Sequence, residues 1–387
     1  MLVYLGICAA LAFLAGLVAA WLGVPPAPTF HLFFSAGAMP LIFGAVIHFV
    51  PVLTRTKSPG RLMRWLPAPV QLAGIATPLA LAGGLPHWTL HATALVVSVA
   101  ALVLVTWVMR RMRATLGHPH PGAHWYGAAL LCLFLAVSLV TVWLVLPELR
   151  PALRLFHLHL NTLGFIGLAA LGTLPVLLPT AVGRPDSAAS GRLRQDLPFA
   201  VAGAIFIAAG AAFASNWLAL PGSALLAWVI VRNLLAWRGA YGWRVIVGDG
   251  VTASLAAASV GLLCVLIWGI AHASGWLPAR PTLAAFVAMF LLPLVTGALA
   301  QLLPVWRYPG VYSPARGAMR ERLAHLGPWR ALAFLAGGGL LALEISAGFL
   351  LVAVGLALFV FVLAQSLWLS VRLDRPQPSD DNPRPLR

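Results

Sequence analysis

The sequence predicts an all-α polytopic membrane protein with twelve transmembrane helices, arranged as three four-helix units with pseudo-threefold symmetry. Three observations lead to this fold class. The 387 residues are 61% hydrophobic and only 9% charged, which is outside the range of soluble domains of this length. Apolar runs of about 18 or more residues, each long enough to cross a bilayer, recur along the chain. A short glycine-to-proline pattern also recurs three times.

The apolar runs predict a single transmembrane domain over residues 1–372. Its twelve helices are expected near residues 2–23, 30–53, 67–83, 88–109, 125–146, 153–178, 197–215, 218–237, 250–274, 281–304, 328–345 and 347–371. The first run starts without a basic segment before it, so a cleaved signal peptide is not expected. Residues 373–387 are polar and Pro-rich, and they are expected to form a disordered cytoplasmic tail.

The charge distribution predicts the orientation. The net charge is +16, but the basic residues do not form a nucleic-acid surface. With the N-terminus in the cytoplasm, the cytoplasmic segments hold 22 of the 25 Lys and Arg residues, and only Arg150, Arg154 and Arg280 face outward. This bias follows the positive-inside rule. We therefore expect a bacterial inner-membrane protein with both termini in the cytoplasm, the lipid bilayer as its partner and no nucleic acid.

The repeated pattern predicts the three units. Helices 2, 6 and 10 end in GAVIHFVP, GTLPVLLP and GALAQLLP, and each has a glycine seven residues before its last proline. These prolines, Pro51, Pro179 and Pro304, are spaced by 128 and 125 residues. The prolines are nearly equally spaced and lie on the second helix of each group of four, which predicts units of about 1–115, 116–245 and 246–372. A twofold inverted repeat, which is usual in transporters, is not expected.

The histidines are the candidate functional residues. Six of the eleven are expected at the outer side of the membrane: His31, His87, His91, His157, His159 and His272. His31 and His159 each lie 20 residues before the repeated proline, where the third unit has Ala284. His157 and His159 are about 200° apart on a helix, so their rings are expected to point into two different spaces between helices.

Imidazole is a common ligand of haem iron, copper and zinc. Several imidazoles at one depth, on different helices, suit an axial haem pair or a copper site. His31, His157 and His159 are therefore candidate cofactor ligands, and the cofactor space is expected between helices 2 and 6. One of His157 and His159 is expected to face this space, together with His31 or the His87/His91 pair. The other is expected to face the space beside helix 7. His87 and His91, four residues apart, can face one way and are candidate metal ligands. The alternative is that these histidines are ordinary interfacial residues.

Two further segments have ordinary explanations. The stretch HPHPGAH holds His118, His120 and His124 in a cytoplasmic loop, where a solvated Pro/Gly loop is favoured over a metal site. The glycine run at 337–339 lies within an apolar segment and lacks the strand, loop and Lys-Ser/Thr of a phosphate-binding loop. Close packing between helices is its favoured use.

These features resemble the catalytic subunit of haem-copper oxidases and nitric oxide reductases. The stretches HLFFSAGAMPLIFGAVIHFVP (31–51) and HLHLNTLGFIGLAALGTLPVLLP (157–179) are similar to helices 2 and 6 of that subunit, and the chain also resembles NnrS-like proteins. The resemblance implies that His31 matches a haem ligand and that His157 or His159 approximates a copper ligand. It implies haem and copper as cofactors, and respiratory-chain or metal-handling proteins as partners.

The chain also departs from that family. Segment 281–304 has no histidine where the family has a haem-ligating pair, and segment 197–215 lacks a His-His copper pair. The outer Arg-Arg pair between helices 11 and 12 is missing too. A complete dioxygen-reducing centre is therefore not expected. Three hypotheses stay open: a haem- or copper-binding protein of respiration, nitric oxide metabolism or metal handling; a small-solute or metal permease; and a non-catalytic assembly or accessory protein of respiratory complexes.

The charge bias generates a topology prediction. A reporter fused after Ser58 should be found in the cytoplasm, and one fused after Glu148 in the periplasm, because the 22-to-3 bias sets the orientation. Fusing alkaline phosphatase, which reports the periplasm, and a fluorescent protein, which reports the cytoplasm, at both positions measures this. Periplasmic activity from the Ser58 fusion would reverse the orientation and remove the common depth of the outer histidines.

Overall fold

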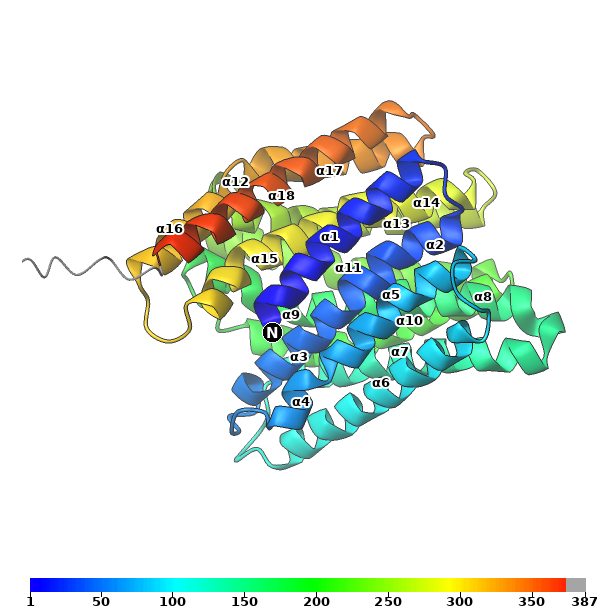
Figure 1. Ribbon diagram of the computed structural model, residues 1–387, viewed down its shortest axis with the longest axis horizontal. Helices are drawn as coiled ribbons and strands as arrows, with labels where there is room; N and C mark the ends of the chain where they lie inside the picture. The colour runs from blue at the N-terminus through cyan, green and yellow to red at the C-terminus, as the bar shows by residue number, and fades with distance from the viewer. Residues whose placement is uncertain (374–387) are drawn as a thin grey trace, which may run out of the picture.

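A computed structural model of the chain describes residues 1–373, and the elements in this range are helices (Figure 1). They are α1 (Leu2–Trp21), α2 (Pro26–His31), η1 (Leu32–Ala38), α3 (Met39–Leu53), α4 (Arg61–Trp65), α5 (Pro67–Leu81), α6 (Thr89–Arg113), α7 (Gly122–Val145), η2 (Pro147–Leu149), α8 (Arg150–His159), η3 (Leu160–Gly167), α9 (Leu168–Val182), α10 (Ala189–Ala212), α11 (Asn216–Tyr241), α12 (Trp243–Gly248), α13 (Gly250–Ala273), α14 (Ala279–Ala285), η4 (Phe286–Leu291), α15 (Leu292–Arg307), α16 (Pro314–Ala324), α17 (Gly327–Ala342) and α18 (Ala347–Leu373). The expected tail lies outside the described residues, apart from its first residue.

The helices confirm a polytopic membrane protein. Within the described residues, ten helical stretches are long and apolar enough to cross a bilayer. The predicted segments 67–83 and 328–345 are also helical, as α5 and α17, but with 15 and 16 residues they are shorter than those ten. The stretches that contain α2, α8 and α14 each run on through a π-helix into α3, α9 and α15.

One predicted boundary is wrong by about two helical turns. Segment 197–215 was expected to begin after the polar residues 190–196, but α10 begins at Ala189. Ion pairs make the polar turns part of the helix. The buried carboxylate of Asp196 lies 2.8 Å from Arg232 Nη1 on α11, and Asp186 pairs with Arg192. From apolar runs alone, such polar residues are predicted to form a loop.

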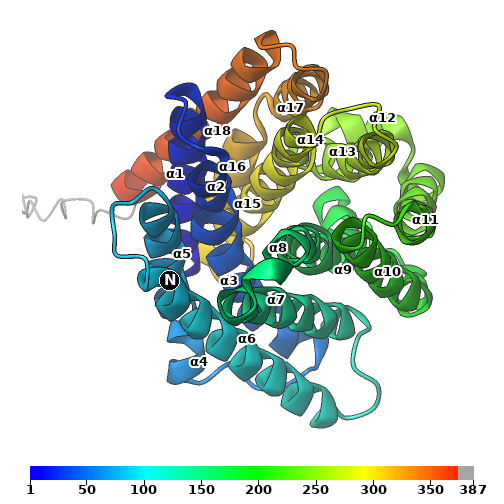
Figure 2. The same cartoon turned by 90° about the vertical axis from the view of Figure 1, so that its right-hand side faces the viewer.

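The three repeated helices occupy the middle of the bundle. Figure 2 looks at the end that carries α2, α8 and α14, and these three lie around the centre with the other helices outside them. Their stretches are 67%, 72% and 78% buried, whereas the other membrane-length helices are 39–61% buried. The opposite end of the bundle carries the short helices α4 and α16 (Figure 1).

Each central helix contains a π-helical segment near the same end. These segments are η1, η3 and η4, and they begin 19, 19 and 18 residues before the repeated prolines. π-Helices are rare, and they mostly appear as single-turn insertions at functional sites. In two of the three, a proline is the second residue after the π-helix: Pro40 after η1 and Pro293 after η4. Proline has no N–H and its ring excludes the carbonyl four residues earlier, so a wider preceding turn accommodates it.

The carbonyls that these prolines leave without a helical partner are packed closely. Pro40 leaves the oxygen of Ala36, which accepts a 2.8 Å hydrogen bond from Gln71 Nε2 on α5. Pro293 leaves the oxygen of Met289, against which Gly261 of α13 packs so tightly that a Cβ on Gly261 would lie 1.9 Å from it. An unpaired carbonyl is costly within a bilayer, so these contacts hold α5 and α13 against the central helices.

A single arginine connects four elements at the α16 end of the bundle. Arg320 of α16 lies 3.2 Å from both carboxylate oxygens of Asp249, which also caps α13 by accepting from the amides of Val251 and Thr252. The same guanidinium donates to Gln301 Oε1 on α15 and to the oxygen of Ala181 on α9. Four elements from two predicted units therefore meet at one side chain.

The tight contact at Gly261 generates a stability prediction. Gly261→Ala should lower the stability of the protein by about 1–3 kcal/mol, because the new methyl group displaces the Met289 backbone. Gly269→Ala in the same helix is the matched control. Nothing lies within 4 Å of its Cβ, so alanine there should be neutral or stabilising by up to about 1 kcal/mol. Thermal unfolding of both variants in detergent measures the difference, and equal shifts would contradict the close contact.

Candidate functional site

His31 and His159 occupy equivalent places in their helices. Each is the last residue of a short α-helix, α2 or α8, and each comes directly before a π-helix. His31 Nδ1 lies 2.7 Å from the oxygen of Ala27, and His159 Nδ1 lies 2.9 Å from the oxygen of Leu155. Both rings are therefore hydrogen-bonded to the carbonyl four residues earlier in their own helix.

Two further outer histidines are held in the same way. His157 Nδ1 lies 2.8 Å from the oxygen of Ala136 on α7, and His272 Nδ1 lies 3.1 Å from the oxygen of Leu277. A carbonyl oxygen only accepts, so in each ring Nδ1 carries the hydrogen. In the neutral imidazole the lone pair is then on Nε2. A metal-bound histidine normally has this arrangement, with the second nitrogen donating to a carbonyl or carboxylate.

The two helix 6 histidines have different neighbours. The His157 ring meets Trp143 of α7 at 5.9 Å between centroids. Among the other histidines, His31 lies near enough to His157, and His272 at the end of α13 near enough to His159, for the charges to repel if both rings were protonated. No repeat or spacing in the sequence connects His272 with His159.

Ala284, 20 residues before Pro304, lines a cavity of about 660 Å³ together with Val24, Phe30 and Glu344. Glu344 has a φ of 61°, in the left-handed region that non-glycine residues rarely adopt. The position with the same spacing to its proline as His31 and His159 thus borders open space.

His87 and His91 form a separate pair. His91 is on α6, and the His87 ring meets it edge to face at 5.8 Å between centroids. The Nδ1 of His91 is buried and has no hydrogen-bond partner. A buried imidazole nitrogen without a partner is unusual, so a bound ligand would account for it.

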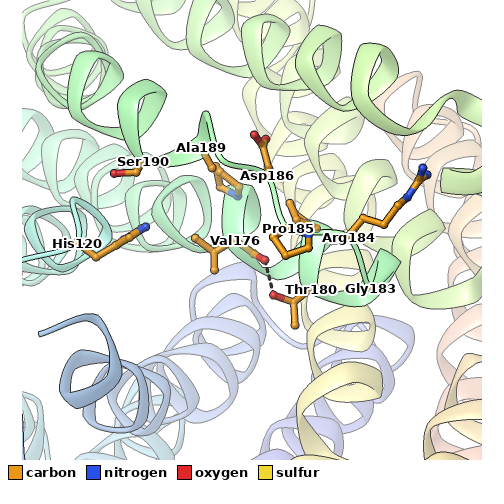
Figure 3. A pocket seen from close by; sticks show the side chains of 11 residues that line it. His120, Val176, Thr180, Gly183, Arg184, Pro185, Asp186, Ala189 and Ser190 are labelled. Carbon is orange, nitrogen blue, oxygen red and sulfur yellow. Dashed lines mark hydrogen bonds between the residues drawn. The ribbon is translucent and has the colours of Figure 1, made fainter. Parts of the chain in front are cut away.

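The HPHPGAH segment forms part of a wall at the opposite end of the bundle. Figure 3 shows His120 facing Val176 and Pro185 across a cavity of about 380 Å³ between α9 and α10. Its Nδ1 accepts a 3.1 Å hydrogen bond from the amide of Gly122, and burial lowers the pKa of His120. The ring is therefore neutral at pH 7 and carries its hydrogen on Nε2. A free solvated loop was expected here, but His120 is anchored.

No family model matches the sequence, and no curated protein matches it. Within residues 1–373 as described, no three or more His, Cys, Asp or Glu side chains form a group able to hold a metal ion.

Proposed function

We propose that this protein is a divergent haem-copper-oxidase-like membrane protein that binds haem near the periplasmic side of a bacterial inner membrane. The observation that carries the proposal is the shared setting of His31 and His159. Each ring comes directly before a π-helix and has its Nδ1 on the carbonyl four residues back. Two matching settings 128 residues apart support a site that was duplicated with its unit.

The proposed architecture has twelve spans in three units, with both termini in the cytoplasm. The three π-helices support the units, because such rare segments recur at nearly the same distance from Pro51, Pro179 and Pro304. In this architecture α5 and α17 cross the membrane as the third helices of their units. Their 15 and 16 residues are short for a bilayer core of about 30 Å, which favours local thinning or help from flanking loops.

The pairs suit haem because haem takes only two ligands from the protein. The porphyrin supplies the other four nitrogens, whereas zinc or copper takes three or four ligands from the chain. His31 and His157 would hold haem through their Nε2 atoms in the space between helices 2 and 6. The Ala27 and Ala136 carbonyls fix the tautomer and the direction of these rings. Haem held by two imidazoles supplies one-electron redox chemistry.

His159 and His272 are a second candidate pair. Their Nδ1 atoms are likewise held by carbonyls, and the two rings interact. With both pairs occupied, the protein would carry two haems at one depth and could pass electrons between them. Such a protein fits a role in respiration or nitric oxide metabolism, with a respiratory-chain protein as its partner.

The second candidate function is metal handling at His87 and His91. The buried, unpartnered Nδ1 of His91 favours it. Copper is the proposed ion, because imidazole suits it and it binds most tightly among the divalent first-row metals. A permease for a small solute and a non-catalytic accessory protein of respiratory complexes are the remaining alternatives. A purified protein without haem or metal would support one of these.

Absorption spectroscopy tests the haem proposal. Protein purified from cells supplied with a haem precursor should show a Soret band and sharp α and β bands when reduced, as low-spin bis-imidazole haem does. His31→Ala and His157→Ala should each remove this spectrum or convert it to a high-spin form, because each removes one axial nitrogen. Haem content by pyridine haemochrome assay gives the stoichiometry.

His48→Ala is the matched control. His48 is on α3, at the other end of the same central helix, where its ring meets Trp306 edge to face at 5.9 Å. This variant should keep the wild-type spectrum. A colourless wild-type protein would contradict the proposal, and a spectrum lost only in His159→Ala and His272→Ala would move the haem to the second pair.

Equilibrium dialysis against Cu²⁺ tests the metal proposal. Haem-free wild-type protein should retain one more equivalent than His91→Ala, since the variant removes the buried nitrogen. His325→Ala, which removes a histidine between α16 and α17, should bind as much copper as the wild type. Equal copper in all three proteins would reject the site.

A further inference from the structure

The first 147 residues contain no acidic side chain. The first acidic residue of the chain is Glu148, yet seven Lys and Arg residues precede it: Arg55, Lys57, Arg61, Arg64, Arg110, Arg111 and Arg113. All seven lie at the α4 end of the bundle, in the loop after α3, in α4 itself, or in the last turn of α6. We call these seven residues, with the exposed Leu62 and Trp65 of α4, the α4 surface.

Direct contacts hold the two parts of the α4 surface together. Arg111 at the end of α6 donates a 2.6 Å hydrogen bond to the oxygen of Lys57, and its guanidinium stacks over Trp107 at 5.0 Å. Nearby, the amide of His120 donates to the oxygen of Leu53 at 3.0 Å. The end of α6 is therefore held against the basic loop that runs from α3 into α4. Six of the seven are exposed, and only Arg111 is half-buried.

Elsewhere at this end of the bundle, three arginines are paired with acidic side chains. Arg192, Arg232 and Arg320 form ion pairs with Asp186, Asp196 and Asp249. In the described part of the chain, no ion pair involves any of the seven cations of the α4 surface. The positive-inside rule explains a basic loop, but it does not require that every acid be absent from one unit.

Apolar side chains lie among these cations. Leu62 is 87% exposed and Trp65 is 59% exposed, and they alternate with Arg61 and Arg64 along α4. A soluble polyanion would leave these apolar side chains in water. A phospholipid covers both kinds of group, since its phosphate meets the cations while its acyl chains meet leucine and tryptophan. Clusters of four to eight basic residues next to a membrane helix attract anionic lipids with about 1 kcal/mol per residue.

We propose that the α4 surface is a binding site for anionic phospholipid in the leaflet that it faces. The headgroup phosphates lie between α4 and the end of α6, and Leu62 and Trp65 enter the acyl region. Lipid at this place holds the first unit against the second, because α6 packs along α7. The proposal is independent of haem or copper and depends only on the protein lying in a bilayer.

Native mass spectrometry of the detergent-purified protein tests the site. Cardiolipin should bind with at least about tenfold higher affinity than phosphatidylcholine, and the preference should weaken as salt is raised. The triple variant Arg61→Gln, Arg64→Gln, Arg113→Gln should lose this preference, with the affinity for cardiolipin falling at least about tenfold.

A second triple variant, Arg194→Gln, Arg238→Gln, Arg244→Gln, is the matched control. It removes the same charge from three exposed arginines elsewhere in the chain and should bind cardiolipin as the wild type does. Size-exclusion profiles and thermal unfolding in detergent establish that both variants are folded. Equal losses in the two variants would reduce the effect to net charge and overturn the site. Equally tight binding of soluble heparin by the lipid-free protein would overturn it in favour of a soluble polyanion.

Discussion

The structure depends on the pairing of backbone carbonyls inside a membrane. Prolines in the central helices remove N–H groups where no water can replace them, and an unpaired carbonyl costs several kcal/mol in a bilayer. The chain meets this constraint with π-helical turns and close neighbours. Gln71 bonds the oxygen that Pro40 leaves, and Gly261 brings a backbone against the oxygen that Pro293 leaves. Packing around the central helices therefore follows from where the prolines lie.

The same constraint determines where the histidines lie in their helices. A π-turn changes the register of a helix, so residues on its two sides face directions that a regular α-helix would not allow. His31 and His159 lie at the start of such turns, while Ser35 and Asn161 place side chains on the oxygens of His31 and His157. The turn thus fixes the backbone on both sides of the candidate ligands. Their rings are held in fixed directions by these backbone contacts.

Much of the fold could be predicted from hydropathy and repeats, because apolar length and equal spacing are visible in a sequence. The twelve predicted segments are helical, and the divergence of His157 from His159 follows from two residues of helical rotation. The start of α10 was wrong because burial of Asp196 depends on Arg232, which lies on another helix. The anchoring of His120 also depends on Leu53, which lies far earlier in the sequence, so no local pattern indicates it.

Arg320 has a consequence for biosynthesis. Its partners, Asp249 and the oxygen of Ala181, leave the ribosome 71 and 139 residues before it. Until α16 emerges, Asp249 can cap α13 through the amides of Val251 and Thr252, but the junction at Arg320 is missing. Helices α9 to α15 can therefore enter the bilayer and adjust against one another while this junction stays open. Synthesis of Arg320 closes it before α17 and α18 are made, so a polar contact joins these helices ahead of the last two.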